Sequence, residues 1–126
     1  MIPLPDQLAV IMARGESLRM GHSKGLCQLN DEGEFFVSRI ASLYLELGIA
    51  CLLVVRPEDE KSYGEVVNRD VVSILPSAGG GDTARTMKLA LDWAASRGEP
   101  PRWFWAHPVD LPLVSSQTIN ILSAAA

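Results

Sequence analysis

Short apolar runs that alternate with segments of helical periodicity constrain this chain more than any other feature. Residues 8–13 and 49–55 are apolar throughout, as in strands buried on both faces, and 71–75 and 103–106 are predicted as a third and a fourth strand. Between them, apolar side chains recur every three or four positions from Phe36 to Leu47 and from Met87 to Ala94, as in amphipathic helices. Strands that alternate with helices predict an α/β fold, a Rossmann-like three-layer sandwich with a mostly parallel sheet.

Residues that commonly begin or end helices mark the boundaries of these segments. Gly48 ends the first helix, Asp82 caps the helix after the third strand, and Ser115 caps a last helix that contains Ile119 and Leu122. The sequence predicts that the helix after Asp82 buries an apolar face formed by Met87, Ala90, Leu91 and Ala94.

Length and composition indicate one domain with a substantial core. A chain of 126 residues, 48% of them hydrophobic, is expected to form a single domain over residues 1–126. A domain near this size buries roughly two-thirds of the surface of its unfolded chain. The sequence has 11 basic and 15 acidic residues and a net charge of −4, which argues against nucleic-acid binding and against attraction to an anionic membrane.

No targeting or membrane signal is apparent in the sequence. Residues 1–6 lack the basic start and long apolar stretch of a signal peptide, and no apolar run approaches the ~18 residues of a membrane span. Cys27 and Cys51 stand among aliphatic residues and have neither a disulfide-framework nor a metal-binding pattern. We therefore expect buried free thiols and a soluble, cytoplasmic protein.

Unusual polar residues gather in three loops that follow predicted strands. These loops cover residues 14–24, 76–82 and 107–112. In parallel sheets with helices on both faces, ligands bind beyond the carboxyl ends of the strands. The three loops are therefore expected to meet at one ligand site.

The first loop has the composition of a phosphate-binding loop. Gly15 and Gly21 allow backbone N–H groups to approach an anion closely, while Arg19, Lys24 and the adjacent Arg14 add positive charge. It is not a Walker A loop, because five residues separate the two glycines and the lysine comes three positions after the second. The alternative interpretation is a solvated turn with ordinary surface cations.

Two further segments have both a functional and a plain structural interpretation. Asp110 follows a strand, where a carboxylate can bind Mg²⁺, or can accept backbone N–H groups in a proline-flanked turn. His107 is a candidate general base, although shaping the turn at Pro108 is its expected role. Residues 79–84 formally match the dinucleotide pattern G-x-G-x-x-A, but three consecutive glycines satisfy that pattern easily.

The stretch 12–24 resembles the opening signature of the molybdenum-cofactor nucleotidyltransferases, the MobA-like NTP transferases. Six residues match that signature in order, namely Gly15, Ser17, Arg19, Met20, Gly21 and Lys24. Arg14 departs from it, since the family usually has Gly or Ala there; a large side chain can crowd the site or reach an anion. The stretch 107–115 resembles the second signature of the family, a strand followed by Asp-x-Pro.

This resemblance implies that residues 1–126 form a single nucleotide-binding domain, the N-terminal part of an NTP-transferase domain of the glycosyltransferase-A-like type. It implies transfer of a nucleoside monophosphate from CTP or GTP to a phosphorylated acceptor such as molybdopterin, with release of pyrophosphate. It assigns catalytic roles to Arg19 and Lys24 and an Mg²⁺ to Asp110. It assigns nucleotide binding to the following residues: Ala13, Arg14, Gly15, Ser17, Gly21 and Thr86.

Family domains are substantially longer than this chain, which leaves three interpretations. The chain is the N-terminal portion of such an enzyme, or a short relative that completes its sheet with another subunit as an oligomer. A catalytically silent nucleotide-binding or interaction module is the alternative from another functional class. Within the enzymes, a sugar-phosphate nucleotidyltransferase is the alternative, because it shares the fold and a similar glycine-rich loop.

Overall fold

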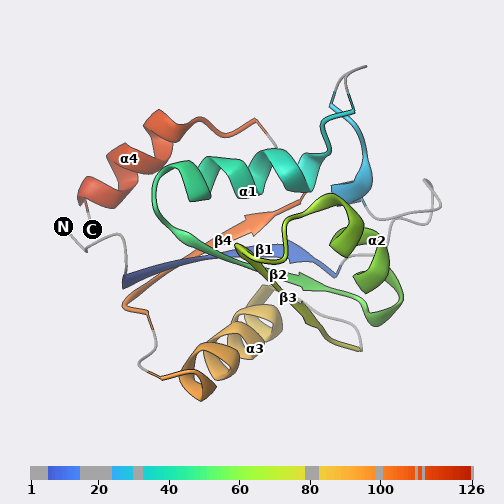
Figure 1. Ribbon diagram of the computed structural model, residues 1–126. Coiled ribbons are helices and arrows are strands. Elements are labelled where there is room, and N and C mark those ends of the chain that lie inside the picture. Colours follow the sequence, from blue (N-terminus) through green and yellow to red (C-terminus); the bar gives the residue numbers. More distant parts are fainter. Residues whose placement is uncertain are drawn as a thin grey trace.

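A four-stranded, all-parallel sheet forms the centre of the computed structural model (Figure 1). The structure describes residues 6–14, 24–29, 33–78, 83–98, 101–109, 111 and 113–125. The strands are β1 (Gln7–Ala13), β2 (Ala50–Val55), β3 (Val72–Pro76) and β4 (Trp103–Pro108), in the order β3-β2-β1-β4. The α/β fold with a parallel sheet, expected from the apolar runs, is confirmed.

Helices cover both faces of this sheet (Figure 1). On one face lie α1 (Phe36–Glu46), α2 (Glu60–Val66) and α4 (Ser116–Ala125), and on the other lies α3 (Thr83–Ser96). Two short 3₁₀ helices, η2 (Lys24–Leu26) and η3 (Pro57–Asp59), complete the described elements. The arrangement is the predicted three-layer sandwich.

The apolar runs of β1 and β2 are continuous because each strand has a core on both sides. Alternate residues such as Ile11 and Leu53 face the core shared with α1, α2 and α4, while Val10 and Leu52 face α3. All four side chains are fully buried. A strand that was solvated on one face would instead alternate apolar and polar residues.

The buried face of α3 differs in one position from the face expected from the sequence. Ala90 and Ala94 are buried and Met87 packs beside them, as predicted, but Leu91 is 46% exposed. Thr86, one turn before Ala90, occupies the buried stripe instead. The buried stripe of α3 therefore consists of Thr86, Ala90 and Ala94, and Leu91 lies beside this stripe.

A buried polar chain anchors α4 to the sheet. The amide of Gln7 donates from Nε2 to Ser123 Oγ at 2.8 Å, and Trp105 Nε1 donates to Gln7 Oε1, also at 2.8 Å. The predicted cap of this helix is confirmed, because the Ser115 hydroxyl accepts the Thr118 backbone N–H at 3.2 Å. Ile119 is buried as expected, whereas Leu122 is half exposed.

Candidate functional site

The strand order identifies the edge of the sheet where a ligand would bind. After β1 the chain passes to α1 on one face, and after β3 it passes to α3 on the opposite face. The order reverses between β1 and β4, and such a switch point opens a crevice at the carboxyl ends of the strands. Val109 N–H donates to Met12 O at 3.1 Å, so the segments that leave β1 and β4 are joined there.

Arg14 connects the end of β1 to the start of α3. Its side chain is buried, with Nη1 donating to Thr86 Oγ1 and Nη2 donating to the Ala78 carbonyl, both at 3.3 Å. These partners lie 72 and 64 residues away in sequence. The structure thus brings together two residues predicted to bind nucleotide, Arg14 and Thr86, and joins the start of the loop 14–24 to the loop 76–82 through Ala78. Ala13, another predicted residue, is buried at the end of β1.

The residues that carry most of the family signature lie outside the described residues. These are Gly15, Ser17, Arg19, Met20 and Gly21 of the first signature and Asp110 of the second. Residues 79–82, in the loop that follows β3, also lie outside the described residues. For Lys24 the structure describes the backbone, which begins η2. Their predicted roles therefore remain predictions.

The seat of η2 is defined by a close approach to α2. Gly25 is buried, and a β-carbon at this position would meet the hydroxyl oxygen of Tyr63 and lie 2.9 Å from its Cε1. Tyr63 is itself fully buried in the core. A side chain at position 25 would therefore clash with Tyr63. The absence of one lets η2, which begins at Lys24, pack against α2.

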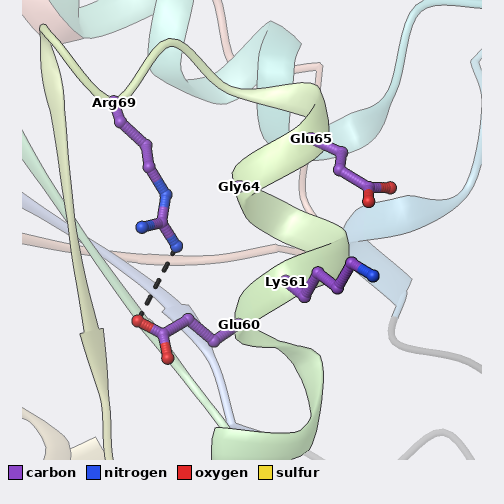
Figure 2. A pocket seen from close by; sticks show the side chains of 5 residues that line it. All are labelled: Glu60, Lys61, Gly64, Glu65 and Arg69. Carbon is purple, nitrogen blue, oxygen red and sulfur yellow. Dashed lines mark ion pairs between the residues drawn. The ribbon is translucent and has the colours of Figure 1, made fainter.

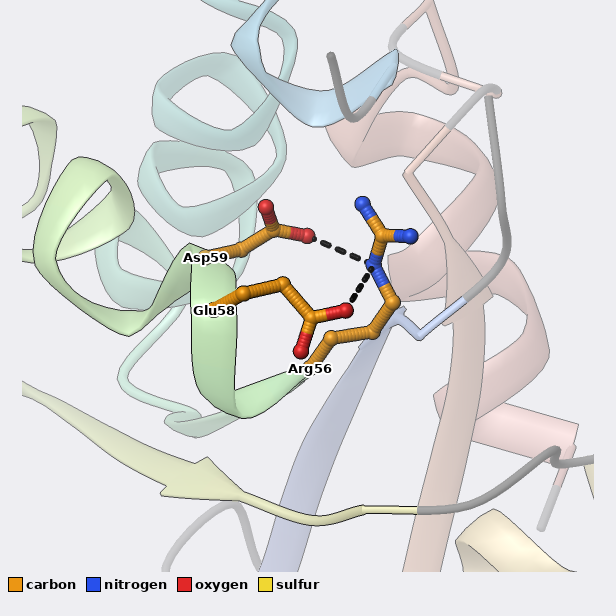
Figure 3. Close-up of polar contacts among 3 residues, drawn as sticks. All are labelled: Arg56, Glu58 and Asp59. Carbon is orange, nitrogen blue, oxygen red and sulfur yellow. Dashed lines mark hydrogen bonds and ion pairs between the residues drawn. The ribbon is translucent and has the colours of Figure 1, made fainter. Parts of the chain in front are cut away.

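Arg56 is a cation at the same edge that the sequence analysis did not identify. It follows β2 directly, and its Nε lies 2.9 Å from Asp59 Oδ2 and 3.7 Å from Glu58 Oε1 (Figure 3). The arginine and Asp59 side chains are only 22% and 14% exposed. An arginine at the carboxyl end of a predicted strand is the signal that could have identified it, and the two carboxylates offset its charge.

His107 lies at the end of β4 with both ring nitrogens hydrogen-bonded. Nδ1 is 2.7 Å from the Tyr44 hydroxyl and Nε2 is 2.6 Å from the Leu111 carbonyl oxygen. The ring is buried and meets Tyr44 edge to face, with 5.5 Å between ring centroids. This geometry agrees with the expected turn-shaping role, since the described contacts of His107 go to the protein's own hydroxyl and backbone.

The described part of the chain contains no group of three or more His, Cys, Asp or Glu side chains that could bind a metal. Mg²⁺ commonly binds through one or two carboxylates plus substrate phosphates, and Asp110, the carboxylate predicted to bind it, lies outside the described residues. An open surface hollow on α2 is lined by Glu60, Lys61, Gly64, Glu65 and Arg69, whose formal charges balance (Figure 2).

The chain belongs to the family of MobA-like NTP transferase domains, whose model matches residues 9–126. The match begins within β1 and includes all three predicted site loops. A search of curated proteins gave no significant match. The family resemblance seen in the two signatures is therefore confirmed at the level of the family.

Solved structures of other proteins are similar to this chain in fold. Rv0371c from Mycobacterium tuberculosis H37Rv is 15% identical with a TM-score of 0.69, over 98% of this chain and 61% of that one. Its complex with manganese is 16% identical with a TM-score of 0.65, over 94% and 59%. The 4-diphosphocytidyl-2C-methyl-D-erythritol synthase of Anaerococcus prevotii DSM 20548 is 18% identical with a TM-score of 0.65, over 94% and 50%.

This chain spans between half and three-fifths of the length of these structural neighbours. None of the helices in the described segments is long and apolar enough to cross a membrane.

Proposed function

We propose that the chain binds a nucleoside triphosphate at the carboxyl ends of β1 and β4 and takes part in nucleotidyl transfer. The observation that carries this proposal is the family match over residues 9–126. It is supported by the contact between Arg14 and Thr86, which joins the end of β1 to the start of α3, and by the hydrogen bond from Val109 to Met12, which joins the end of β4 to β1.

The proposed reaction moves a nucleoside monophosphate to a phosphorylated acceptor. A phosphate oxygen of the acceptor forms a bond to the α-phosphorus of the triphosphate. The bond from that phosphorus to the bridging oxygen of the β-phosphate breaks, and pyrophosphate leaves with the electron pair. Such a reaction depends on positioning and charge neutralisation more than on acid–base groups.

Charges from the first loop would act on the leaving group. We assign Arg19 and Lys24 to the β- and γ-phosphates, where cations stabilise the charge that develops as pyrophosphate departs. Backbone N–H groups at Gly15 and Gly21 would bind the same phosphates. The remaining nucleotide-binding residues that we assign are Ala13, Arg14, Ser17 and Thr86.

Asp110 is the residue that we assign to a divalent cation, Mg²⁺ in the working protein. The ion would supply charge neutralisation at the phosphates when bound. A manganese complex is known for one structural neighbour, which makes Mn²⁺ a suitable probe. For the nucleotide we propose CTP or GTP, and for the acceptor a phosphorylated compound such as molybdopterin. A neighbour named as a diphosphocytidyl-methylerythritol synthase is compatible with a cytidine nucleotide.

Calorimetric titration with CTP, GTP, ATP and UTP, with and without Mg²⁺, tests the proposal. We expect Mg²⁺-dependent binding of one triphosphate, and a loss of at least about tenfold in affinity in Lys24→Ala and in Asp110→Ala, because charge-assisted contacts contribute roughly 1.5–3 kcal/mol each. Matched controls are Lys61→Ala and Asp92→Asn, exposed residues on α2 and α3, which should bind as the wild type does.

The outcomes separate the competing functions. Failure to bind any triphosphate contradicts the proposal. Binding without pyrophosphate release, measured with molybdopterin and with sugar phosphates as acceptors, would favour the catalytically silent nucleotide-binding module. Turnover with a sugar phosphate alone would favour the sugar-phosphate nucleotidyltransferase.

A further inference from the structure

His107 connects three parts of the fold that are distant in sequence. It is the fifth residue of β4, where it pairs with Ile11 of β1, and its ring lies in the layer beneath α1. From there it contacts Tyr44 of α1 through Nδ1 and the backbone of Leu111 through Nε2. The imidazole therefore links the core to the segment that leaves β4.

The partners of the ring determine which nitrogen carries the proton. The Leu111 carbonyl oxygen only accepts hydrogen bonds, so Nε2 must donate to it. In a neutral imidazole Nδ1 is then an acceptor, and the Tyr44 hydroxyl donates to it. Burial raises the pKa of the Tyr44 phenol, so the hydroxyl keeps its proton and can act as this donor. The orientation of the ring is thus fixed from both sides.

The contact at Nε2 closes the turn that follows β4. Leu111 N–H donates to Pro108 O at 3.2 Å, which is the hydrogen bond of a four-residue turn. The carbonyl of the same Leu111 is held by His107, and the turn is held to β1 by the bond from Val109 N–H to Met12 O. The residues on both sides of position 110 are therefore fixed by three hydrogen bonds.

We infer that His107, oriented by Tyr44, is a positioning residue: by holding Leu111, the residue after Asp110 in sequence, it contributes to the affinity of the site for the divalent cation. This inference rests on the proposed role of Asp110. Groups that hold and orient metal ligands commonly affect metal affinity without touching the metal. A side chain that holds the peptide on one side of the ligand acts in the same way, through the backbone.

Two substitutions of the same residue test this inference. In His107→Gln the side-chain amide nitrogen can take the place of Nε2 and donate to Leu111, whereas in His107→Asn the shorter amide matches Nδ1 and cannot reach it. Because the site is expected to use substrate phosphates as well as Asp110, Mn²⁺ binding is measured in the ternary complex with the triphosphate that binds in the calorimetric titration, by the enhancement of water proton relaxation, with Asp110→Asn as reference. Hydrogen exchange of the peptide covering residues 108–114 is measured in parallel by mass spectrometry.

We expect Mn²⁺ affinity to fall by about tenfold or more in His107→Asn, the usual effect of losing a group that orients a metal ligand. Affinity in His107→Gln should stay close to that of the wild type, and exchange of peptide 108–114 should be faster in the Asn variant only. If His107→Asn does not fold, Tyr44→Phe replaces it, because it removes only the hydroxyl that orients the ring; a smaller decrease in affinity is then expected.

The two measurements separate failure of the inference from failure of the proposed function. Equal Mn²⁺ affinity in the Asn variant and the wild type, with Asp110→Asn deficient, would overturn the inference and leave the metal site intact. Mn²⁺ binding unchanged in Asp110→Asn would overturn the proposed role of Asp110, and the positioning role with it. Loss of affinity in both Gln and Asn variants, with equal exchange rates, would also contradict turn positioning.

Discussion

Arg14 illustrates what a single residue can reveal in sequence and what it cannot. The family resemblance marks Arg14 as a departure, and its side chain could crowd the site or reach an anion. The structure directs the guanidinium to Thr86 and to the carbonyl of Ala78. Neither partner could be inferred from sequence, because both lie on the far side of β2 and β3 in chain order. Thr86 itself was identified only through the family resemblance.

Cys51 permits a prediction at the same scale. Its side chain is 3% exposed, and burial raises the pKa of its thiol from 9.0 to about 12. Because the thiolate is the nucleophile, iodoacetamide at pH 8 should leave Cys51 unmodified in the folded protein. Cys27 is only partly buried and should be alkylated.

Intact-mass measurement checks this prediction. The native protein should take one carbamidomethyl group, assigned to Cys27 by peptide mapping, and the urea-unfolded protein should take two. The Cys51→Ala variant should take one in both states. Alkylation of Cys51 at the same rate as Cys27 under native conditions would show that the strand carrying it opens readily.

At the scale of elements, the sequence predicted the strands and helices well but not how the elements are seated. Every strand begins within a residue of the run that predicted it. The pattern is clearest for β1 and β2, because strands buried on both faces have no polar positions to obscure it. The close contact of η2 with α2 was not predicted, since Gly25 has no sequence signal that distinguishes it from a loop glycine. The contact of His107 with Tyr44 of α1 was also not predicted, although the turn after His107 was expected.

A pair of glycine substitutions tests the contact between η2 and α2. Gly25→Ala should destabilise the protein by about 1–3 kcal/mol, because the added methyl group overpacks the buried ring of Tyr63. Gly64→Ala is the matched control. Its β-carbon would meet only the guanidinium of Arg69, the far end of a half-exposed, flexible side chain (Figure 2).

Gly64 lies within α2, so alanine there should leave stability unchanged or raise it by up to about 1 kcal/mol through helix propensity. Urea unfolding at pH 7 measures both variants. If the two substitutions changed the free energy of unfolding equally, the predicted importance of the Gly25–Tyr63 contact would be wrong.

At the scale of the whole molecule, Tyr44 and Cys51, buried side chains whose pKa values are raised, link stability to alkaline pH. Burial raises the pKa of both groups, and for Tyr44 the nearby Cys51 adds to the effect of burial. In the unfolded chain both groups ionise near their ordinary values of 10.0 and 9.0. Unfolding above these values therefore releases protons, so the stabilising contribution is present below about pH 9 and is lost as the pH rises.

The expected decrease is about 1.4 kcal/mol per pH unit for each group that ionises only on unfolding. Urea unfolding between pH 8 and pH 11 measures the slope in the wild type, in Tyr44→Phe and in Cys51→Ala. Each variant should have a shallower slope than the wild type, whatever its stability at pH 8. Identical slopes would mean that these groups ionise alike in the folded and unfolded protein.

The pairing of β4 with β1 also has a consequence for the order in which the protein is made. Gln7 of β1 pairs with Trp103 of β4, whereas the pairs β1–β2 and β2–β3 join strands that are closer in sequence. Closing so long a loop costs more entropy than forming the earlier pairs. During synthesis, the ribosome releases β4 only after β1, β2 and β3 have emerged. A nascent chain that ends before residue 103 contains three of the four strands but lacks the one that pairs with β1 beside the proposed nucleotide site.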